Sequence, residues 1–384
     1  MVILRPSTPQ EVQEMVRTHD RLLPRGGGTK TALSTPRADQ TVLDLSGLSG
    51  VLEYDPGEYV FVAKAGTRLA EIQDMLAQNG QYLPFDPPFV EAGATLGGTV
   101  AAGLSGPMRQ RYGGVRDFIL GVRFVDGEGN LLQGGGKVVK NAAGFDLPKL
   151  MVGSLGRLGG IVEVAFKVFP FPKATATLKV TFGSLEGALE ALYKLSGSVF
   201  EFYALDLEPN PQDIAFATGG AGNPATLTLR IGGLPETLPA RLDRLRQFLG
   251  NPPEDHTLLE GEAERSYWAF TNKLEAQSYS DPASAGTQWE HGYLVKVPLQ
   301  PSKIPSLEAS LGPGIRRYLA AGNLLYLSWP DSIAKLDALL KAQGLSGLVL
   351  RGSLESPWIG VDLSQTFGAR VTAALDPSGR FSSY

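Results

Sequence analysis

The pattern of apolar and polar positions predicts a helix near the start of the chain. Val12 and Val16 lie one helical turn apart in the segment PQEVQEMV. Thr8 is suited to cap this helix, Pro9 to occupy its first position, and Glu11 to complete a capping box. The first element that we expect is therefore an amphipathic helix with one apolar face.

Strand-like apolar runs follow, separated by a second predicted helix. That helix begins after Gly66, is expected to be capped by Thr67, and ends at Asn79-Gly80. A hairpin is predicted further on, with its turn at residues 126–130 between two apolar runs. The strand-like segments are TVLDLSGL, YVFVAKAG, DFILGVRFV and GGIVEVAFKVF. Strands mixed with capped helices indicate an α+β domain.

The pattern of predicted strands and helices changes after Pro172, which we take as the first domain boundary. The next part alternates strand-like runs such as TATLKVTF and LLYLSW with amphipathic helices such as SLEGALEALYKL. We therefore predict two domains, both α+β, the second built on an antiparallel sheet. The expected ranges are 1–172, 173–350 for this cap domain, and 351–384 for a C-terminal segment that returns to the first domain.

Composition excludes several classes of protein. The 384 residues carry 35 Lys and Arg against 39 Asp and Glu, a net charge of −4, so nothing indicates nucleic-acid binding. The chain contains no cysteine, which excludes disulfides, thiolate catalysis and a cysteine-held iron–sulfur cluster within it. No apolar run is long enough for a membrane span. The apolar run at the start of the sequence is too short for a signal peptide, because a proline interrupts it early. We expect a cytoplasmic protein that reaches the inner membrane only through partners.

Glycine is abundant, with 47 residues, and clusters in the first half of the chain. The common nucleotide motifs do not fit these clusters. A P-loop needs Gly-Lys followed by Ser or Thr, but Gly136-Lys137 is followed by Val138. A Rossmann fingerprint needs a strand before its glycines, and the segment GSLGRLGG follows a helix-like stretch.

Three glycine-rich stretches remain in the first domain: PRGGGTK, GATLGGTVAAGLSG and GSLGRLGGI. One such stretch would be read as a surface turn. Three, flanked by hydroxyl side chains, favour an extended anionic ligand such as a pyrophosphate, because bare backbone N–H groups can reach its oxygens. On this interpretation a Cβ at Gly27 would occupy space that the phosphate needs.

These stretches also carry a family resemblance. PRGGGT, DPGEYVFVAKAGTRLAEIQDML, ATLGGTVAAGLSG and KNAAGFDLPKLMVGSLGRLGGIVEV occur in the order found in the FAD domain of the vanillyl-alcohol oxidase / p-cresol methylhydroxylase (PCMH-type) family. The ending ALDPSGRFSS resembles that family's return to the flavin domain. Within the family, the stretch from residue 105 to 156 is similar to the smaller of the flavin subunits of bacterial glycolate oxidases.

The resemblance assigns roles to residues of the three stretches. Pro87 and Pro88 would shape the approach to the second loop. The remaining expected FAD contacts divide into a pyrophosphate loop, a second wall, and a ribose and adenine end: Arg25, Gly26, Gly27, Gly28, Thr29 and Lys30; Thr95, Gly97 and Gly98; and Gly153, Gly156, Gly159 and Ile161. Thr29 and Lys30 stand where some relatives attach FAD through histidine, so we expect non-covalent FAD.

Catalytic residues are not identified by the sequence, and we expect no metal site. Arg109 and Arg111 could clamp a substrate carboxylate, or could lie in a solvated loop together with Arg116. His256 and His291 could act as a general base, since imidazole titrates near neutral pH, or could be structural. No H-x-x-D-G-N-x-H-like stretch, which family members that oxidise 2-hydroxy acids often carry, is present.

The resemblance implies an FAD subunit of a glycolate oxidase complex that converts glycolate to glyoxylate. Its expected partners are a larger FAD subunit and an iron–sulfur subunit, with a partner subunit or a quinone as electron acceptor. Two alternatives stay open. The chain could be a stand-alone FAD-dependent dehydrogenase of another small 2-hydroxy acid such as D-lactate, or a non-catalytic subunit that holds flavin for assembly.

Overall fold

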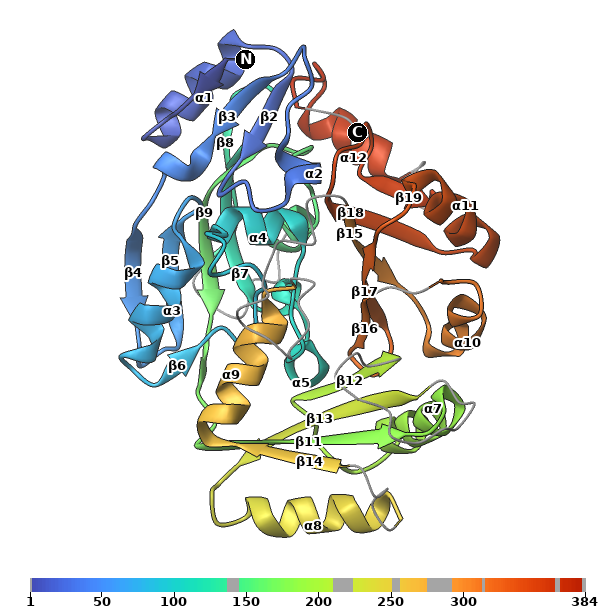
Figure 1. Cartoon of the computed structure of the whole chain (residues 1–384). Helices are drawn as coiled ribbons and strands as arrows, with labels where there is room; N and C mark the ends of the chain where they lie inside the picture. The colour runs from blue at the N-terminus through green and yellow to red at the C-terminus, as the bar shows by residue number, and fades with distance from the viewer. Residues whose placement is uncertain are drawn as a thin grey trace, which may run out of the picture. The chain divides into compact units, whose positions relative to one another are not determined.

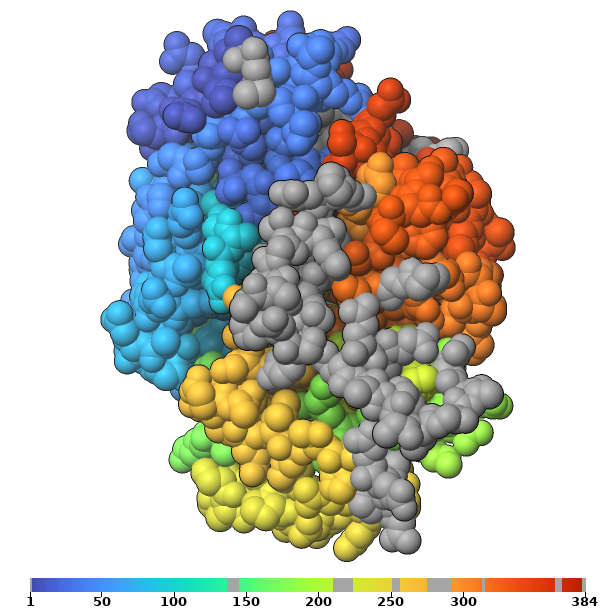
Figure 2. Space-filling view, in the orientation of Figure 1, coloured from blue at the N-terminus to red at the C-terminus, as the bar shows by residue number. Residues whose placement is uncertain are grey.

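The computed structural model describes residues 2–136, 145–209, 224–250, 256–274, 292–312, 315–362 and 367–381. All other residues are drawn in grey (Figures 1 and 2). The chain divides into two units. Unit 1 comprises Met1–Gly106, Gly113–Phe171 and Leu363–Tyr384, and unit 2 comprises Pro107–Tyr112 and Pro172–Asp362.

Unit 1 contains a small parallel sheet and a larger antiparallel one (Figure 1). The parallel sheet has the order β1-β3-β2, and the five-stranded sheet has the order β4-β5-β9-β7-β8. A short pair, β6 and β10, completes the strands. The strands of unit 1 are β1 Ile3–Leu4, β2 Leu22–Arg25, β3 Thr41–Asp44, β4 Val51–Asp55, β5 Val60–Lys64, β6 Gln81–Tyr82, β7 Ile119–Val125, β8 Leu131–Gly135, β9 Gly160–Lys167 and β10 Phe169–Pro170.

The helices of unit 1 are short. They are α1 Pro9–Thr18, α2 Thr31–Ser34, α3 Leu69–Ala77, α4 Leu96–Ala102, α6 Leu147–Met151 and α12 Phe367–Leu375, with 3-10 turns η1 Leu45–Gly47 and η2 Val115–Asp117. A cluster of fully buried side chains, among them Val12, Leu22 and Leu43, joins α1 to β2 and β3. Phe381 belongs to the same cluster, and Leu22 N–H donates to the carbonyl of Arg380, so the C-terminal residues pack into this core.

Two of the predicted helix starts can be checked. Thr8 caps α1 by accepting from the N–H of Glu11, as predicted, but the Glu11 carboxylate accepts from the N–H of Ser7, so the capping box is displaced by one residue. Thr67 does not cap α3. Its hydroxyl donates to the carbonyl of Lys64 instead, and α3 begins after Arg68 without a side-chain cap. The predicted hairpin of β7 and β8 is confirmed.

Unit 2 is built on one nine-stranded sheet in which every neighbouring pair is antiparallel, which confirms the predicted fold class. Its order is β14-β11-β13-β12-β16-β17-β15-β18-β19. The strands are β11 Ala174–Phe182, β12 Ala204–Pro209, β13 Ala225–Gly233, β14 His256–Glu260, β15 Tyr293–Pro298, β16 Arg316–Leu319, β17 Leu324–Trp329, β18 Ser346–Arg351 and β19 Trp358–Gly360.

Helices pack on this sheet, and the sequence pattern had indicated only some of them. Figure 2 shows α8 and α9 at the surface of unit 2. The pattern predicted α7, α8 and α11 but not α9 or α10. The helices are α5 Arg109–Tyr112, α7 Leu185–Ser196, α8 Leu238–Phe248, α9 Gly261–Asn272, α10 Ile304–Glu308 and α11 Ile333–Gln343, with 3-10 turn η4 Pro301–Lys303.

The two faces of the large sheet differ in polarity. On β11, Leu178 and Val180 belong to the buried apolar core, whereas Thr177 accepts a hydrogen bond from Trp268 of α9. Arg230 of β13 pairs with Glu264 of α9 at 2.7 Å, and both side chains are buried. The face covered by α9 is therefore polar, because alternate residues of a strand point to opposite faces.

The division between the units lies between Phe171 and Pro172, next to the boundary expected from the proline-rich stretch. The C-terminal segment of unit 1 begins at Leu363 rather than at residue 351. Residues before it belong to unit 2 because β19 pairs with β18. Pro107–Tyr112 also belongs to unit 2, where α5 packs against β12.

Candidate functional site

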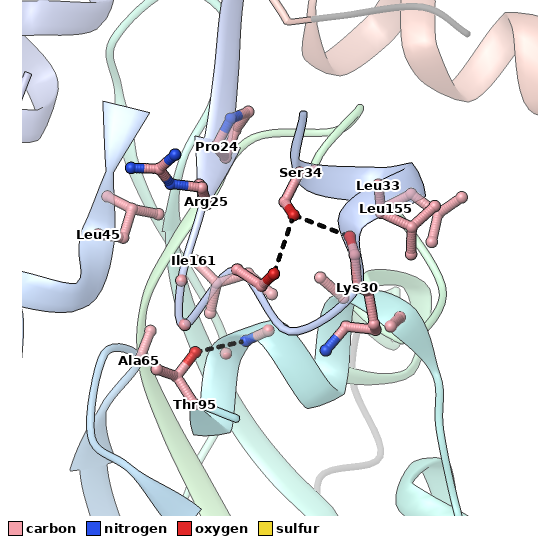
Figure 3. A pocket seen from close by; sticks show the side chains of 18 of the residues that line it. Pro24, Arg25, Lys30, Leu33, Ser34, Leu45, Ala65, Thr95, Leu155 and Ile161 are labelled. Carbon is pink, nitrogen blue, oxygen red and sulfur yellow. Dashed lines mark hydrogen bonds between the residues drawn. The ribbon is translucent and has the colours of Figure 1, made fainter. Parts of the chain in front are cut away.

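A pocket in unit 1 is lined by all three glycine-rich stretches (Figure 3). It contains about 680 Å³ of empty space, part of it open to solvent. The first stretch contributes the turn after β2, the second the start of α4, and the third the loop before β9. The lining residues are Pro24, Arg25, Gly26, Gly27, Gly28, Thr29, Lys30, Leu33, Ser34, Leu45, Ala65, Thr95, Gly97, Gly98, Ala101, Ala102, Leu155, Gly156, Gly159 and Ile161.

Three of the glycines allow the loops to approach one another. A Cβ at Gly27 would overlap the carbonyl oxygen of Gly93, and one at Gly26 would overlap the hydroxyl of Thr95. A Cβ at Gly97 would lie 2.6 Å from the Cβ of Ala65. The prediction that a Cβ at Gly27 would occupy the space of the phosphate is therefore wrong, because that Cβ would meet the backbone of Gly93. The absence of side chains lets the first and second stretches pack closely, and the pocket lies beside that junction.

Backbone conformation explains other glycines of the lining. Gly28 and Gly156 have φ angles of 67° and 78°, a left-handed conformation that glycine adopts without a steric penalty. Leu155 lines the pocket with a φ of 54°, which is uncommon for a residue with a side chain. Strained backbone of this kind is concentrated at ligand sites.

Lys30 is the most buried cation in the described pocket lining, with 8% of its surface exposed. Its Nζ donates to the hydroxyl of Thr29 at 3.0 Å and lies 5.8 Å from the centre of the Phe89 ring. Pro87 and Pro88 are buried but do not line the pocket. They precede Phe89, so their position affects the pocket through the ring that contacts Lys30.

Arg25 contributes to the lining, but its charge is paired with Asp44. The guanidinium donates to Asp44 at 3.2 Å and extends away from the loop that follows β2 (Figure 3). Burial alone would raise the pKa of Asp44, but hydrogen bonds from Ser46 and the charge of Arg25 lower it below its ordinary value. Arg25 therefore joins the end of β2 to the end of β3, which fixes where the loop begins.

Ser34 is a pocket residue that the sequence did not indicate. Its hydroxyl donates to the carbonyls of Lys30 and Gly28, at 2.8 and 3.3 Å, and so closes the loop between β2 and α2 (Figure 3). The spacing of four residues from Lys30 was the available signal, because a serine one helical turn later can reach that carbonyl. On the facing stretch, Thr95 caps α4 by accepting from the N–H of Gly98 at 3.3 Å.

Comparison with known proteins identifies this part of the chain. Residues 1–135 match the family described as FAD binding domain. This stretch is an FAD-binding domain. The pocket fits that assignment, because glycine backbone, Lys30 and two threonines are among the residues that line it.

Curated relatives match about half of the chain. Glycolate oxidase subunit GlcE of Escherichia coli strain K12 is 44% identical over 170 residues, which is 44% of this chain and 48% of the relative. D-lactate dehydrogenase of Archaeoglobus fulgidus is 29% identical over 200 residues, 51% of this chain and 44% of the relative. The chain thus matches about half the length of each of these relatives.

Among solved structures, an alkyldihydroxyacetonephosphate synthase has a TM-score of 0.71 over 98% of this chain and 76% of its own, at 16% identity. At that identity the similarity establishes the fold and nothing about the reaction. It extends over both units, whereas the sequence similarity to the curated relatives covers about half of the chain.

The expected FAD contacts divide into those that line the pocket and those that do not. Gly153 does not line the pocket. Its N–H donates to the carbonyl of Val100, so it holds the third stretch against α4. Gly159 lines the pocket and has a φ of 141°, and a Cβ there would overlap the carbonyl of Val125. The residues brought to the pocket are Arg25, Gly26, Gly27, Gly28, Thr29, Lys30, Thr95, Gly97, Gly98, Gly156, Gly159 and Ile161.

Arg109, Arg111 and His256 do not line this pocket. Arg109 and Arg111 lie on α5 of unit 2, where Arg111 pairs with Glu201 at 2.8 Å. His256 is exposed at the start of β14, an edge strand, rather than in the expected loop. His291 lies outside the described residues.

Neither a metal-ligand cluster nor a membrane-spanning helix occurs among the described residues. No group of three or more His, Cys, Asp or Glu side chains is arranged to hold a metal ion in the part of the chain described above. Over the same ranges, no helix has both the length and the apolar character needed to cross a bilayer.

Proposed function

We propose that this protein is an FAD-binding subunit of a glycolate oxidase-type complex. The observation that carries the proposal is the pocket at the junction of the three glycine-rich stretches, and the 44% identity to a glycolate oxidase subunit over 170 residues supports it. The complex would oxidise glycolate to glyoxylate, which removes two electrons and two protons from the substrate. FAD supplies the acceptor for a hydride equivalent when it is bound.

The residues of the pocket would act by binding and positioning. Backbone N–H groups of Gly26–Lys30 and of Gly97 and Gly98 would donate to the pyrophosphate, and Lys30 would balance part of its charge. Gly156, Gly159 and Ile161 would hold the ribose and adenine end. The binding would be non-covalent, because the chain has no cysteine and the described residues of the pocket lining include no histidine or tyrosine to which flavin could be attached.

The proposed partners are a larger FAD subunit and an iron–sulfur subunit, which would pass electrons to a quinone. Two relatives support a shared reaction class. One is a D-lactate dehydrogenase and another, from Bacillus subtilis, is glycolate oxidase subunit GlcD, at 29% identity over 172 residues. The substrate in each case would be a small 2-hydroxy acid.

A second candidate function is a subunit that holds flavin while a partner performs the oxidation. The position of His256 favours it, because an exposed side chain on an edge strand is poorly placed to remove a proton from an enclosed substrate. A stand-alone dehydrogenase for D-lactate is the third possibility, and the same experiment separates it from the other two.

The test is flavin reduction by glycolate and by D-lactate, followed by stopped-flow absorbance. The FAD-loaded chain is measured alone and after co-purification with its partners from the native host. We expect slow reduction or none in the isolated chain, and rapid reduction by glycolate in the complex. Rapid reduction of the isolated chain would overturn the dependence on partners, and reduction by D-lactate alone would overturn the choice of glycolate.

A further inference from the structure

Three consecutive glycines form the part of the pocket lining that lies between β2 and α2. Gly26, Gly27 and Gly28 all line the pocket, and within the described part of the chain none of their N–H groups donates a hydrogen bond. Successive N–H groups of a turn can form a concave site for an anion. Such a site binds more tightly when the loop already has the binding conformation before the anion arrives.

The glycines do not fix that conformation by themselves. Glycine loses more conformational freedom on folding than any other residue, so three in succession need contacts on both sides. The pairing of β2 with β3, which extends to Arg25 and Asp44, fixes the start of the loop. The close approach of Gly27 to Gly93 restricts its middle. The end of the loop, where Gly28 has a φ of 67°, needs a contact of its own.

Ser34 supplies the contact at that end. Its hydroxyl donates to the carbonyl of Lys30 at 2.8 Å and to the carbonyl of Gly28 at 3.3 Å (Figure 3). The Lys30 carbonyl also accepts from the N–H of Leu33 at 3.0 Å, so it would keep one partner without Ser34. Among the described residues, the Gly28 carbonyl accepts from Ser34 alone. Loss of the hydroxyl would therefore release the Gly28 end of the loop.

The bond to Gly28 controls the direction of the backbone. A peptide unit is planar, so the direction of the Gly28 carbonyl also fixes the plane of the peptide that leads to Thr29. Ser34 thus holds the rotation of this peptide, at a glycine whose own side offers no steric restraint. The three N–H groups before this peptide and Lys30 after it are kept in one arrangement.

We propose that Ser34 is a positioning residue for FAD binding, because its hydroxyl keeps the loop 26–30 in the conformation that binds an anion. The proposal rests on the part of the proposed function in which this loop binds the pyrophosphate. A serine hydroxyl has one proton, and the carbonyls of the loop already accept it. Ser34 therefore acts on the loop and not as a donor to the cofactor.

The experiment measures how fast FAD associates with the full-length apoprotein and dissociates from it, by stopped-flow flavin fluorescence. Ser34→Thr keeps the hydroxyl, and Ser34→Val has the same shape without it. Ser34→Ala removes the hydroxyl without added bulk, and it replaces Ser34→Val if that variant does not fold. The matched control is Ser196→Val in α7 of unit 2, where the hydroxyl donates to the carbonyl of Leu192 at 2.7 Å. Urea unfolding of each apoprotein is measured in parallel.

We expect the association rate constant to fall by about a factor of three to ten in Ser34→Val, the ordinary effect of one hydrogen bond on a conformational equilibrium. The dissociation rate constant should not change, because only the fraction of molecules with the binding conformation is reduced. Ser34→Thr and Ser196→Val should bind FAD as the parent does.

Three results would overturn the proposal. Faster dissociation with unchanged association in Ser34→Val would make Ser34 a direct contact of FAD. A lower urea midpoint with both rate constants unchanged would leave Ser34 a structural role only. A parent chain that does not bind FAD would contradict the proposed function as well, whereas a parent that binds FAD with the same rate constants as Ser34→Val would overturn the role of Ser34 alone.

Discussion

Gly27 faces the carbonyl oxygen of Gly93 so closely that a Cβ at residue 27 would overlap it. The relationship joins the first glycine-rich stretch to the second, and both line the pocket of unit 1. A side chain at residue 27 would have to push the two stretches apart, because the atom that it meets is backbone. Whether this position tolerates a side chain therefore depends on loop packing rather than on direct contact with the cofactor.

Gly27→Ala is predicted to weaken FAD binding at least tenfold while unit 2 stays folded. Loss of one hydrogen bond to a charged group costs about 1.5–3 kcal/mol, and about 1.4 kcal/mol is a factor of ten. Fluorescence titration of the apoprotein with FAD measures the change. Gly183→Ala is the control, since no atom lies within 4 Å of a Cβ built there. Unchanged affinity in Gly27→Ala would show that the loops can separate without harm to the site.

Acid precipitation is predicted to release all of the flavin into the supernatant. The reason is the chemistry of the pocket lining, which offers hydroxyl, amine and guanidinium groups but no histidine, tyrosine or cysteine. Absorbance of the supernatant and of the washed pellet measures the distribution. A pellet that stays yellow after washing would contradict non-covalent binding.

Asp44→Asn is predicted to destabilise unit 1 at neutral pH by about 1–3 kcal/mol, the usual cost of breaking a buried charged hydrogen bond. The folded state lowers the pKa of Asp44 below 3.8, so its carboxylate adds stability above that pH and loses it as the pH falls further. Urea unfolding at several pH values should therefore show the parent and the variant converging in acid. Asp39→Asn, in the exposed pair with Arg21, should cost less than about 1 kcal/mol. A constant difference between parent and Asp44→Asn at all pH values would contradict this account.

Lys296→Met is predicted to stabilise unit 2 near pH 7 in the absence of ligand. Burial lowers the pKa of Lys296 from 10.5 in the unfolded chain to about 8 in the folded one, so the unfolded state binds more protons between these values. The stability of the parent should therefore rise from about pH 8 to about pH 10.5, and the advantage of the variant, at most about 3 kcal/mol, should shrink over that window. Denaturant unfolding of both proteins from pH 7 to 10.5 measures it. Parallel stability curves would show that Lys296 titrates normally.

Local features of the fold could be predicted from the sequence because they depend on neighbouring residues. Thr8 reaches an N–H three residues away, and the turn at residues 126–130 lies between two strands that pair directly. Thr67 shows where this reasoning ends. The same residue type before a helix is held by Gly50 and Lys64, so its hydroxyl is not available for the first turn of α3. Bonds to Gly50, which is distant in the chain, and to Lys64 thus replaced the expected helix cap.

The residues of the candidate site were likewise predicted only in part from the sequence. The glycine-rich stretches and their hydroxyl and lysine side chains are visible in the sequence, and twelve of the fifteen expected FAD contacts line one pocket. Ser34 and Ala65 were missed because their roles follow from folding. Ser34 closes the loop from α2, and Ala65 lies against Gly97. The reason for a glycine at residue 27 also required its neighbour, Gly93, which lies far away in the chain.

The sequence by itself indicated an α+β fold through its apolar periodicity. The order of its motifs resembled an FAD-binding family, and that resemblance named FAD and proposed the three glycine-rich stretches as its binding loops. The tertiary structure alone decided which atoms face one another. Strand register placed Lys296, Tyr326 and Arg317 in one row across β15, β17 and β16. A shift of one residue in register would turn every side chain of a strand to the opposite face, so such a row depends on pairing that no local pattern specifies.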